Sequence, residues 1–595
     1  MKNILKSIAF AAIVSVAASC EISEFTPNDF GEGMVVSNAT NIQMALNTFY
    51  ASRFPSLTEA YSSEGGSDYA IANSLSGRFT VGYDSKSESS FGGWGTVRDI
   101  NYFLSLMESE ACGVSGAEKA NYVAQGRFFR ALKYFEILTQ YGDIPYFDHV
   151  VTAATGDEYK DRDSRDYVVL KINEDLDYAM ENITAESKDA TTVTKYVAAF
   201  VKMRVNLFEA SFRKYNNVST SVLGKAFSNY TVEDLYSEAA SAAKFIMDSG
   251  KFELASSYRS LFTSKALDTK EVILGAATSS TIMGSQNTYY NYSNQKSLVR
   301  NFINTYLMKD GTAYTAKAGY ATETFATEFK DRDPRLAAIV RTPGYKYSGK
   351  VVVPSIADQS APLGYQIIKF SLDACPDGAN DSKGGSNNNS VPVYRYAEVL
   401  LAYAEAKAEL GQLSDADWAA TVGAIRKRAG ITGGLTSKPT AVDSYLKANF
   451  FPDVTDAAIM EIRRERACEL CLEGQRVDDL LRWGRGELLA KASWTGINFP
   501  ALDSAYDADG DGNADYYFTT SSSVPAESKS IAVKVDGSTG LAAVANGSVM
   551  QLVYKVPENN RYWAADGHLV LKALPYSEIE LYSKNGHTLT QNPGY

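Results

Sequence analysis

The sequence predicts a mainly α-helical protein with a second, irregular region that is rich in loops. The segment Tyr394–Leu410 contains neither glycine nor proline, and Gly411 follows it directly as a C-terminal stop. Several other long segments repeat apolar residues at helical spacing. By contrast, residues 261–390 and 487–567 are rich in polar and small residues and lack that spacing. We therefore expect a helical scaffold that carries irregular insertions.

The segment Tyr394–Leu410 is expected to lie inside the scaffold. On a helical projection, its charged residues Arg395, Glu398, Glu405 and Glu409 fall in one narrow arc, and apolar residues cover most of the remaining surface. A helix with so narrow a polar arc is packed on several sides by other helices.

The N-terminal half of the scaffold is expected over residues 38–260. Its predicted helices are Asn38–Phe54, Thr96–Met107, Ala117–Tyr141, Asp166–Ile183, Thr194–Tyr215 and a sixth that Thr231 caps and Gly250 ends. The spacing of Ala131 and Phe135 is typical of tetratricopeptide-like helix pairs. No strict repeat period is visible, so we predict helix pairs rather than a regular solenoid.

The second half of the scaffold is expected over residues 391–486. Ser414 and Asp417 form a capping pattern before a helix predicted at Trp418–Arg428, and Thr455–Trp483 is predicted as the last long helical block. A C-terminal segment follows at 568–595. We expect residues 20–595 to form a single unit.

The composition excludes some classes of function. The chain has 595 residues and a formal net charge of −12, so a nucleic-acid-binding role is not expected. Aromatic residues make up 12 % of the chain, and 38 of them are tyrosines. A tyrosine ring can stack on a ligand while its hydroxyl stays in water.

Residues 1–19 are predicted to be a targeting signal. Lys2 and Lys6 precede a short apolar run, and small residues lead into Cys20. This order is similar to a bacterial lipoprotein signal, in which Cys20 would be acylated and become the first residue. The alternative is an ordinary secretory signal with a chance cysteine. No later run is long and apolar enough to span a membrane, so we expect a lipid anchor.

The remaining cysteines are expected to be structural. Four cysteines follow Cys20, too few for a disulfide scaffold of this size. Cys468 and Cys471 form a C-x-x-C pattern, but it lies inside a helical pattern and not at a helix start, so core packing is favoured. With three histidines in the chain, a zinc site is not expected.

An acidic stretch is a candidate calcium loop. It carries oxygen-bearing side chains at alternate positions: Asp507, Asp509, Asp511, Asn513 and Asp515. A full EF-hand is not expected, because the twelfth position is Phe518 and no helix pattern flanks the stretch. The alternatives are a looser calcium site and a solvated acidic turn.

No catalytic motif is recognisable. The stretch Gly344–Lys350 fits a phosphate-loop pattern, but Val351 follows it where Ser or Thr is needed, so we reject this interpretation. An aromatic set is more informative: Trp94 precedes a helix, and Tyr289, Tyr290 and Tyr292 lie in a polar region with Arg300 nearby. Such side chains can bind sugar rings and their hydroxyls. The alternatives are a core tryptophan and a half-buried strand.

Several blocks along the mature chain resemble the SusD/RagB family of outer-membrane lipoproteins. They are Val97–Leu104, Arg127–Phe135, Tyr141–Pro145, Asp331–Leu336, Tyr394–Leu401, Ile462–Arg466, Glu473–Arg476 and Gln591–Tyr595. The departures are Ala17 in the signal, the two helical cysteines, and the acidic stretch, which looks like an insertion.

The resemblance implies a non-catalytic, lipid-anchored protein on the outer face of the outer membrane. It would bind an oligosaccharide or polysaccharide and deliver it to a SusC-like TonB-dependent transporter barrel. Trp94 lies near the place where starch-binding members have an aromatic contact, and is the first candidate for the ligand site. The alternatives are a peptide receptor of the same fold, a glycoside hydrolase, and a mainly structural lid on the transporter.

Overall fold

The computed structural model describes residues 32–54, 64–72, 77–278, 297–358, 360–374, 389–555 and 560–595. The predicted signal peptide, Cys20, and the ligand candidates Tyr289, Tyr290 and Tyr292 lie outside the described residues.

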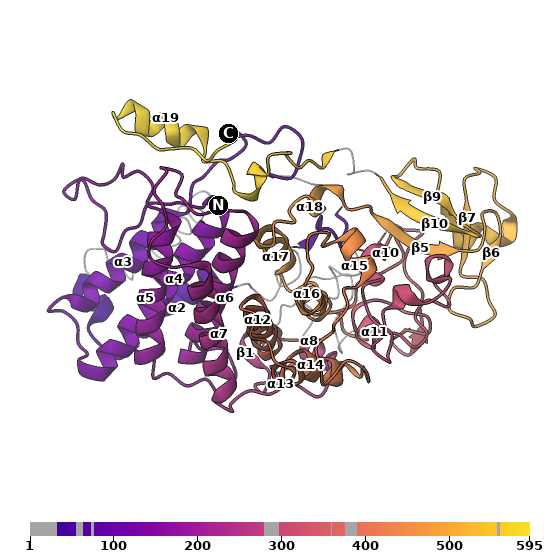
Figure 1. The fold of residues 1–595 in the computed structure, drawn as a ribbon, viewed down its shortest axis with the longest axis horizontal. Helices are drawn as coiled ribbons and strands as arrows, with labels where there is room; N and C mark the ends of the chain where they lie inside the picture. The colour runs from indigo at the N-terminus through magenta and orange to yellow at the C-terminus, as the bar shows by residue number, and fades with distance from the viewer. Residues whose placement is uncertain are drawn as a thin grey trace, which may run out of the picture.

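The N-terminal half is a layer of long helices, as predicted (Figure 1). Its elements are η1 Glu32–Val36, α2 Ala39–Arg53, α3 Trp94–Glu108, α4 Gly116–Tyr141, α5 Arg165–Asn182, α6 Lys195–Tyr215 and α7 Val232–Asp248. Consecutive helices from α3 to α7 pack against one another. The predicted capping box of α7 is confirmed: the Thr231 hydroxyl accepts from the Asp234 amide, and the Asp234 carboxylate accepts from the Thr231 amide.

The second half of the scaffold is built around α12, which packs on α6, α7 and α16. Its helices are α12 Tyr396–Glu409, α13 Asp415–Ala420, α14 Val422–Ala429, α15 Ser444–Asn449, α16 Ala457–Glu469, α17 Arg476–Arg482 and α18 Leu488–Lys491. Gly411 follows α12 with a positive φ of 68°, the conformation expected at a helix stop.

Three predicted helix boundaries are wrong. Tyr394 and Arg395 belong not to α12 but to strand β4, which pairs antiparallel with β1. The helix predicted at Trp418–Arg428 breaks at Thr421, where φ is −118° and ψ is −92°. The last block is interrupted after Glu469 by a turn, in which Leu472 and Gly474 have positive φ.

Outside the long helices, the chain forms short strands and short helices, and β5, β6, β7, β9 and β10 lie together at the right of Figure 1. The strands are β1 Val272–Ala276, β2 Lys346–Tyr347, β3 Lys350–Val351, β4 Val391–Arg395, β5 Thr495–Phe499, β6 Ala505–Tyr506, β7 Tyr516–Thr519, β8 Ala532–Lys534, β9 Leu541–Asn546 and β10 Val549–Tyr554. They form the sheets β1-β4, β2-β3, β5-β10-β9 and β6-β7-β8. The β2-β3 hairpin occupies the rejected phosphate-loop pattern.

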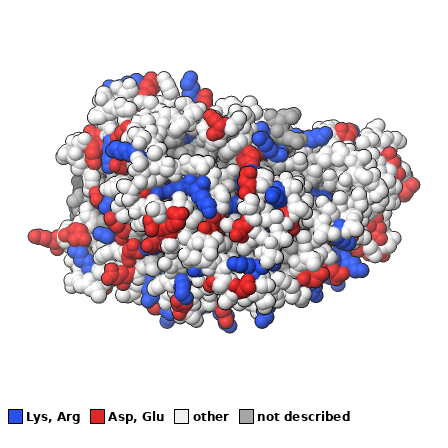
Figure 2. Space-filling view, viewed as in Figure 1, with Lys and Arg blue, Asp and Glu red and all other residues white. Residues whose placement is uncertain are grey.

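Short helical elements complete the chain. They are α8 Ser260–Thr263, α10 Arg300–Ile303, η3 Tyr314–Ala316, η4 Tyr320–Thr322, α11 Arg335–Ile339, η5 Ala526–Ile531, η7 His568–Val570 and α19 Tyr576–Lys584. None of the helices in the described part of the chain has both the length and the apolar character that crossing a membrane requires. On the face in Figure 2, acidic and basic side chains are interspersed, without a broad basic patch.

Cys468 and Cys471 are buried in the apolar core of the irregular region, in agreement with the predicted structural role. Burial raises the pKa of the Cys468 thiol to about 12. A thiol with so high a pKa is a poor nucleophile, because the thiolate is the reactive form.

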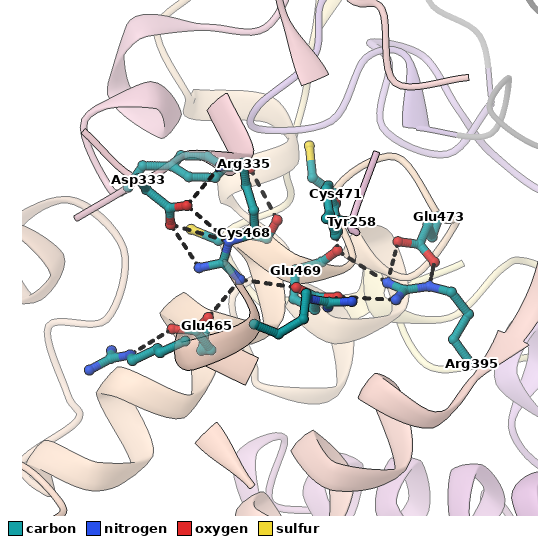
Figure 3. Close-up of polar contacts among 12 residues, drawn as sticks. Tyr258, Asp333, Arg335, Arg395, Glu465, Cys468, Glu469, Cys471 and Glu473 are labelled. Atoms are coloured by element: carbon teal, nitrogen blue, oxygen red, sulfur yellow. Dashed lines mark hydrogen bonds and ion pairs between the residues drawn. The ribbon is translucent and has the colours of Figure 1, made fainter. Parts of the chain in front are cut away.

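A buried ion-pair network joins the scaffold to the irregular region (Figure 3). We call it the Glu469 network; its members are Glu271, Asp333, Arg335, Arg395, Arg426, Arg428, Glu465, Glu469 and Glu473. At its centre, Glu469 accepts from Arg335 at 3.0 Å, from Arg395 at 3.1 Å, and from Arg428. These arginines come from α11, the end of β4 and α14.

Each arginine of this network also reaches a second carboxylate. The Arg395 guanidinium donates to both oxygens of Glu473 at 2.7 Å. Arg335 pairs with Asp333 at 2.7 Å and with Glu465 at 2.6 Å. The fork of a guanidinium suits such paired contacts, and these charges are therefore ion-paired although they are buried.

The polar arc predicted on α12 is also buried and ion-paired. Glu398 pairs with Arg204 at 2.7 Å, and Glu405 accepts from Arg482 at 2.8 Å. Glu409 pairs with Lys214 at 2.6 Å. The arc thus faces other helices and not solvent.

We expect the protein to lose stability in acid because of these pairs. Burial by itself raises the pKa of Glu469, but the charges of Arg428, Arg395 and Arg335 outweigh it and hold this pKa at about 2, against an ordinary 4.5. A depressed pKa contributes stability that is fully present above pH 4.5 and is lost as the pH falls toward 2. Urea unfolding at a series of pH values measures this; a free energy of unfolding that stays constant from pH 5 to pH 2.5 contradicts it.

We expect Glu469→Gln to destabilise the fold strongly. The substitution removes one carboxylate charge that three buried arginines share, and breaking a buried ion pair costs about 3–5 kcal/mol. Glu181→Gln on the exposed side of α5 is the matched control and should change stability by less than about 0.5 kcal/mol. Urea denaturation followed by circular dichroism gives both values, and equal stabilities for the two variants would show that the network contributes little.

Candidate functional site

Trp94 is placed by a glycine turn at the start of α3. The preceding Gly92 and Gly93 have φ values of 76° and 68°, a left-handed conformation that favours glycine. A Cβ atom on Gly92 would lie 2.9 Å from Cε2 of the Trp94 ring. The two glycines therefore let the chain turn and let the indole pack over the turn itself.

The Trp94 indole is half-buried and packs against the rings of two neighbouring phenylalanines. It makes edge-to-face contacts with Phe91 at 5.4 Å and Phe147 at 6.0 Å between ring centroids. It also lines a cavity of about 280 Å³, which we call the Trp94 cavity. The apolar part of its wall consists of Trp94, Val97, Pro145, Phe147, Val151 and Tyr582.

Four polar side chains complete the wall of the Trp94 cavity: Arg98, Asn101, His149 and Glu158. Arg98 lies one helical turn after Trp94, and Arg98 and Glu158 are both exposed. Within the described residues, neither of these two makes an ion pair or a side-chain hydrogen bond. Their charged ends are therefore available to a ligand.

Other side chains hold the wall in place. The Asn101 amide donates to the carbonyl oxygens of Phe147 and His149 at 2.9 and 3.0 Å. The His149 ring hydrogen-bonds with Asp148 at 3.2 Å and with Asp157 at 2.9 Å. The segment that follows α4 is thus fixed against α3.

The acidic stretch forms the turn between β6 and β7. Carboxylate oxygens of Asp507, Asp509 and Asp511 lie within 4.8 Å of one another. Asp515 instead accepts from the Ala508 amide at 2.8 Å, and burial raises its pKa. Asn513 donates its backbone amide to Asp511 at 2.7 Å. Three of the five candidate metal ligands therefore converge.

Comparisons with known proteins identify the fold. A family model described as "SusD family" matches residues 261–595, which is more than half of the chain. The chain belongs to the SusD family. A second family model, described as "Starch-binding associating with outer membrane", matches residues 67–207. Among curated proteins, none matches this sequence.

Solved SusD-like structures share the whole architecture. A SusD-like carbohydrate-binding protein from Bacteroides fragilis is 18 % identical, with a TM-score of 0.66 over 92 % of this chain and 98 % of that one. A second SusD-like protein from that organism is 21 % identical, with a TM-score of 0.65 over 96 % and 99 % of the two chains. A SusD homologue from Bacteroides thetaiotaomicron is 16 % identical, with a TM-score of 0.56 over 95 % and 98 %. These likenesses show the fold.

Within this SusD fold, the predicted ligand residues Trp94 and Arg300 do not lie in the same cavity. Trp94 lines a cavity, but Arg300 is buried: its guanidinium pairs with Glu328 at 2.9 Å and donates to the Tyr365 hydroxyl at 3.0 Å. Because Arg300 is committed to protein partners, we leave it out of the proposed ligand contacts. The tyrosines of the predicted cluster lie outside the described residues.

The sequence analysis missed the polar wall of the Trp94 cavity. Arg98 could have been found, since it follows Trp94 at the i+4 spacing of one helix face. No sequence signal connects Trp94 with Tyr582, which α19 brings in from the C-terminal end of the chain.

Proposed function

We propose that this protein captures an oligosaccharide or polysaccharide at the cell surface, without cleaving it, and delivers it to a SusC-like TonB-dependent transporter. A fatty acid on Cys20 would anchor it to the outer membrane. Membership in the SusD family supports carbohydrate binding, and the description of the second family model supports association with the outer membrane. The first of the two similar Bacteroides fragilis proteins, which is 18 % identical, is described as a SusD-like carbohydrate-binding protein.

The Trp94 cavity is the observation that carries this proposal. A sugar ring has an apolar C–H face, which packs on an indole, and hydroxyl groups at its edge, which need charged or polar partners. In this cavity Arg98 lies one helical turn after Trp94 and has no ion pair within the described residues, and Glu158 lines the same wall. This combination supports sugar binding.

The same wall favours binding over hydrolysis. Most glycoside hydrolases need two carboxyl groups that flank the bond to be cleaved. Among the described residues that line the Trp94 cavity, Glu158 is the one carboxylate. A sugar ring packed on Trp94 would therefore meet one carboxylate and not the flanking pair that this hydrolysis needs.

Affinity-gel electrophoresis against a panel of neutral polysaccharides tests the proposal. At least one polysaccharide should retard the protein, and Trp94→Ala should weaken that binding by roughly thirtyfold, corresponding to about 2 kcal/mol for a central aromatic contact. Tyr562→Ala removes an exposed aromatic ring outside the Trp94 cavity and should leave the retardation unchanged. If no polysaccharide retards the protein, or if Trp94→Ala behaves as the parent does, the proposed site is wrong.

The convergent carboxylates of Asp507, Asp509 and Asp511 favour a further role for the acidic turn, and we propose that it binds one calcium ion. Isothermal titration with calcium should give a one-site curve that Asp509→Asn weakens at least tenfold. Asp310→Asn, an exposed aspartate in another turn, should leave the curve unchanged. A titration of the parent protein without heat of binding would favour the solvated acidic turn.

A further inference from the structure

A second cavity adjoins the Trp94 cavity. It has a volume of about 550 Å³, lies beside α3 and α4, and shares Asn101 and His149 with the first. We call it the α3–α4 cavity. Asn101 and His149 line both cavities, so the two adjoin each other along α3, and we call them together the groove.

One face of α3 lines this groove over the whole length of the helix. Trp94 and Arg98 line the first cavity, Asn101 lines both, and Ser105 and Glu108 line the second. Their spacings of four, three, four and three residues are those of a single helix face. At about 1.5 Å per residue, the groove runs for roughly 20 Å along α3, which is long enough for several linked sugar rings.

Buried hydrogen bonds and an ion pair stabilise the junction between the two cavities. The Asn101 side chain, which fixes the neighbouring segment, accepts from the Arg130 guanidinium at 3.2 Å. That guanidinium in turn donates to both oxygens of Asp175 at 2.7 and 2.8 Å. The groove floor therefore rests on buried, fully bonded groups and does not need to form upon binding.

The α3–α4 cavity is more polar than the Trp94 cavity. The Arg127 side chain, about one-third exposed, lines this cavity; its guanidinium lies over the Tyr178 ring at 4.2 Å, and its Nε is 3.9 Å from Asp175. Asp148 and Ser105 line the same wall and are exposed. These groups donate and accept hydrogen bonds, as the hydroxyls of a sugar chain require.

We propose that the α3–α4 cavity is an extension subsite, so that the protein binds a chain of sugars along α3 and selects long oligosaccharides over short ones. One ring packs on Trp94, and the following rings pass His149 and bond with Ser105, Arg127 and Asp148. This inference rests on the proposed glycan-binding function. It adds the residues by which the protein would prefer long oligosaccharides to short ones.

Titration with the disaccharides and hexasaccharides of the malto-, cello-, xylo- and manno- series tests the proposal. In the series that binds, the hexasaccharide should bind at least tenfold more tightly than the disaccharide. Ser105→Tyr fills the α3–α4 cavity from an exposed helix position, and should bring hexasaccharide affinity down to that of the disaccharide while disaccharide affinity stays the same.

Asp99→Tyr is the matched control, since Asp99 is exposed on α3 but lines neither cavity. It should leave both affinities unchanged, and unchanged melting temperatures show that both variants fold. A polysaccharide whose gel retardation is lost in Trp94→Ala but kept in Ser105→Tyr overturns the extension subsite and leaves the proposed function standing. If the parent binds none of these sugars and no polysaccharide retards it, both proposals fail.

Discussion

The carboxylate of Glu469 lies where the helical scaffold meets the irregular region. Because this carboxylate is buried, its charge must be paired with arginines. Arg335, Arg395 and Arg428 reach it from three separate elements, and each of them is bonded to at least one further carboxylate. A buried charge without a partner is far more costly than an exposed one. The network therefore admits few relative positions of α11, β4, α14 and α16.

A smaller set of buried ion pairs and hydrogen bonds also holds the walls of the groove. Asp175 on α5 fixes Arg130 on α4, which contacts Asn101 on α3, and Asn101 fixes the segment that carries Phe147 and His149. The ligand-facing side chains thus stand on helices that are tied by buried bonds. A preformed wall of this kind reduces the ordering cost of binding.

Much of the fold could be predicted from local patterns, because apolar periodicity and capping residues act over a few neighbours. The errors occur where residues distant in sequence determine the local secondary structure. Tyr394 and Arg395 have helical neighbours in sequence but are drawn into β4 by pairing with β1. In the turn after Glu469, the Leu472 amide likewise donates to the hydroxyl of Tyr69, a partner distant in sequence that local propensity does not encode.

The site was less predictable than the fold for the same reason. Trp94 could be singled out because it precedes a predicted helix and lies near the aromatic contact of starch-binding family members, whereas Tyr582 becomes part of the wall through α19 alone. The polar sequence neighbours of Arg300 predict a sugar contact, but its guanidinium forms a buried ion pair with Glu328.

Hydroxyl-radical footprinting, with the polysaccharide that retards the protein most strongly, tests the location of the site most directly. We expect the bound glycan to reduce oxidation of the half-buried Trp94 several-fold and to leave the exposed ring of Tyr562 unprotected. Oxidation of Trp94 that stays unchanged while the glycan is demonstrably bound would place the binding site elsewhere on the molecule.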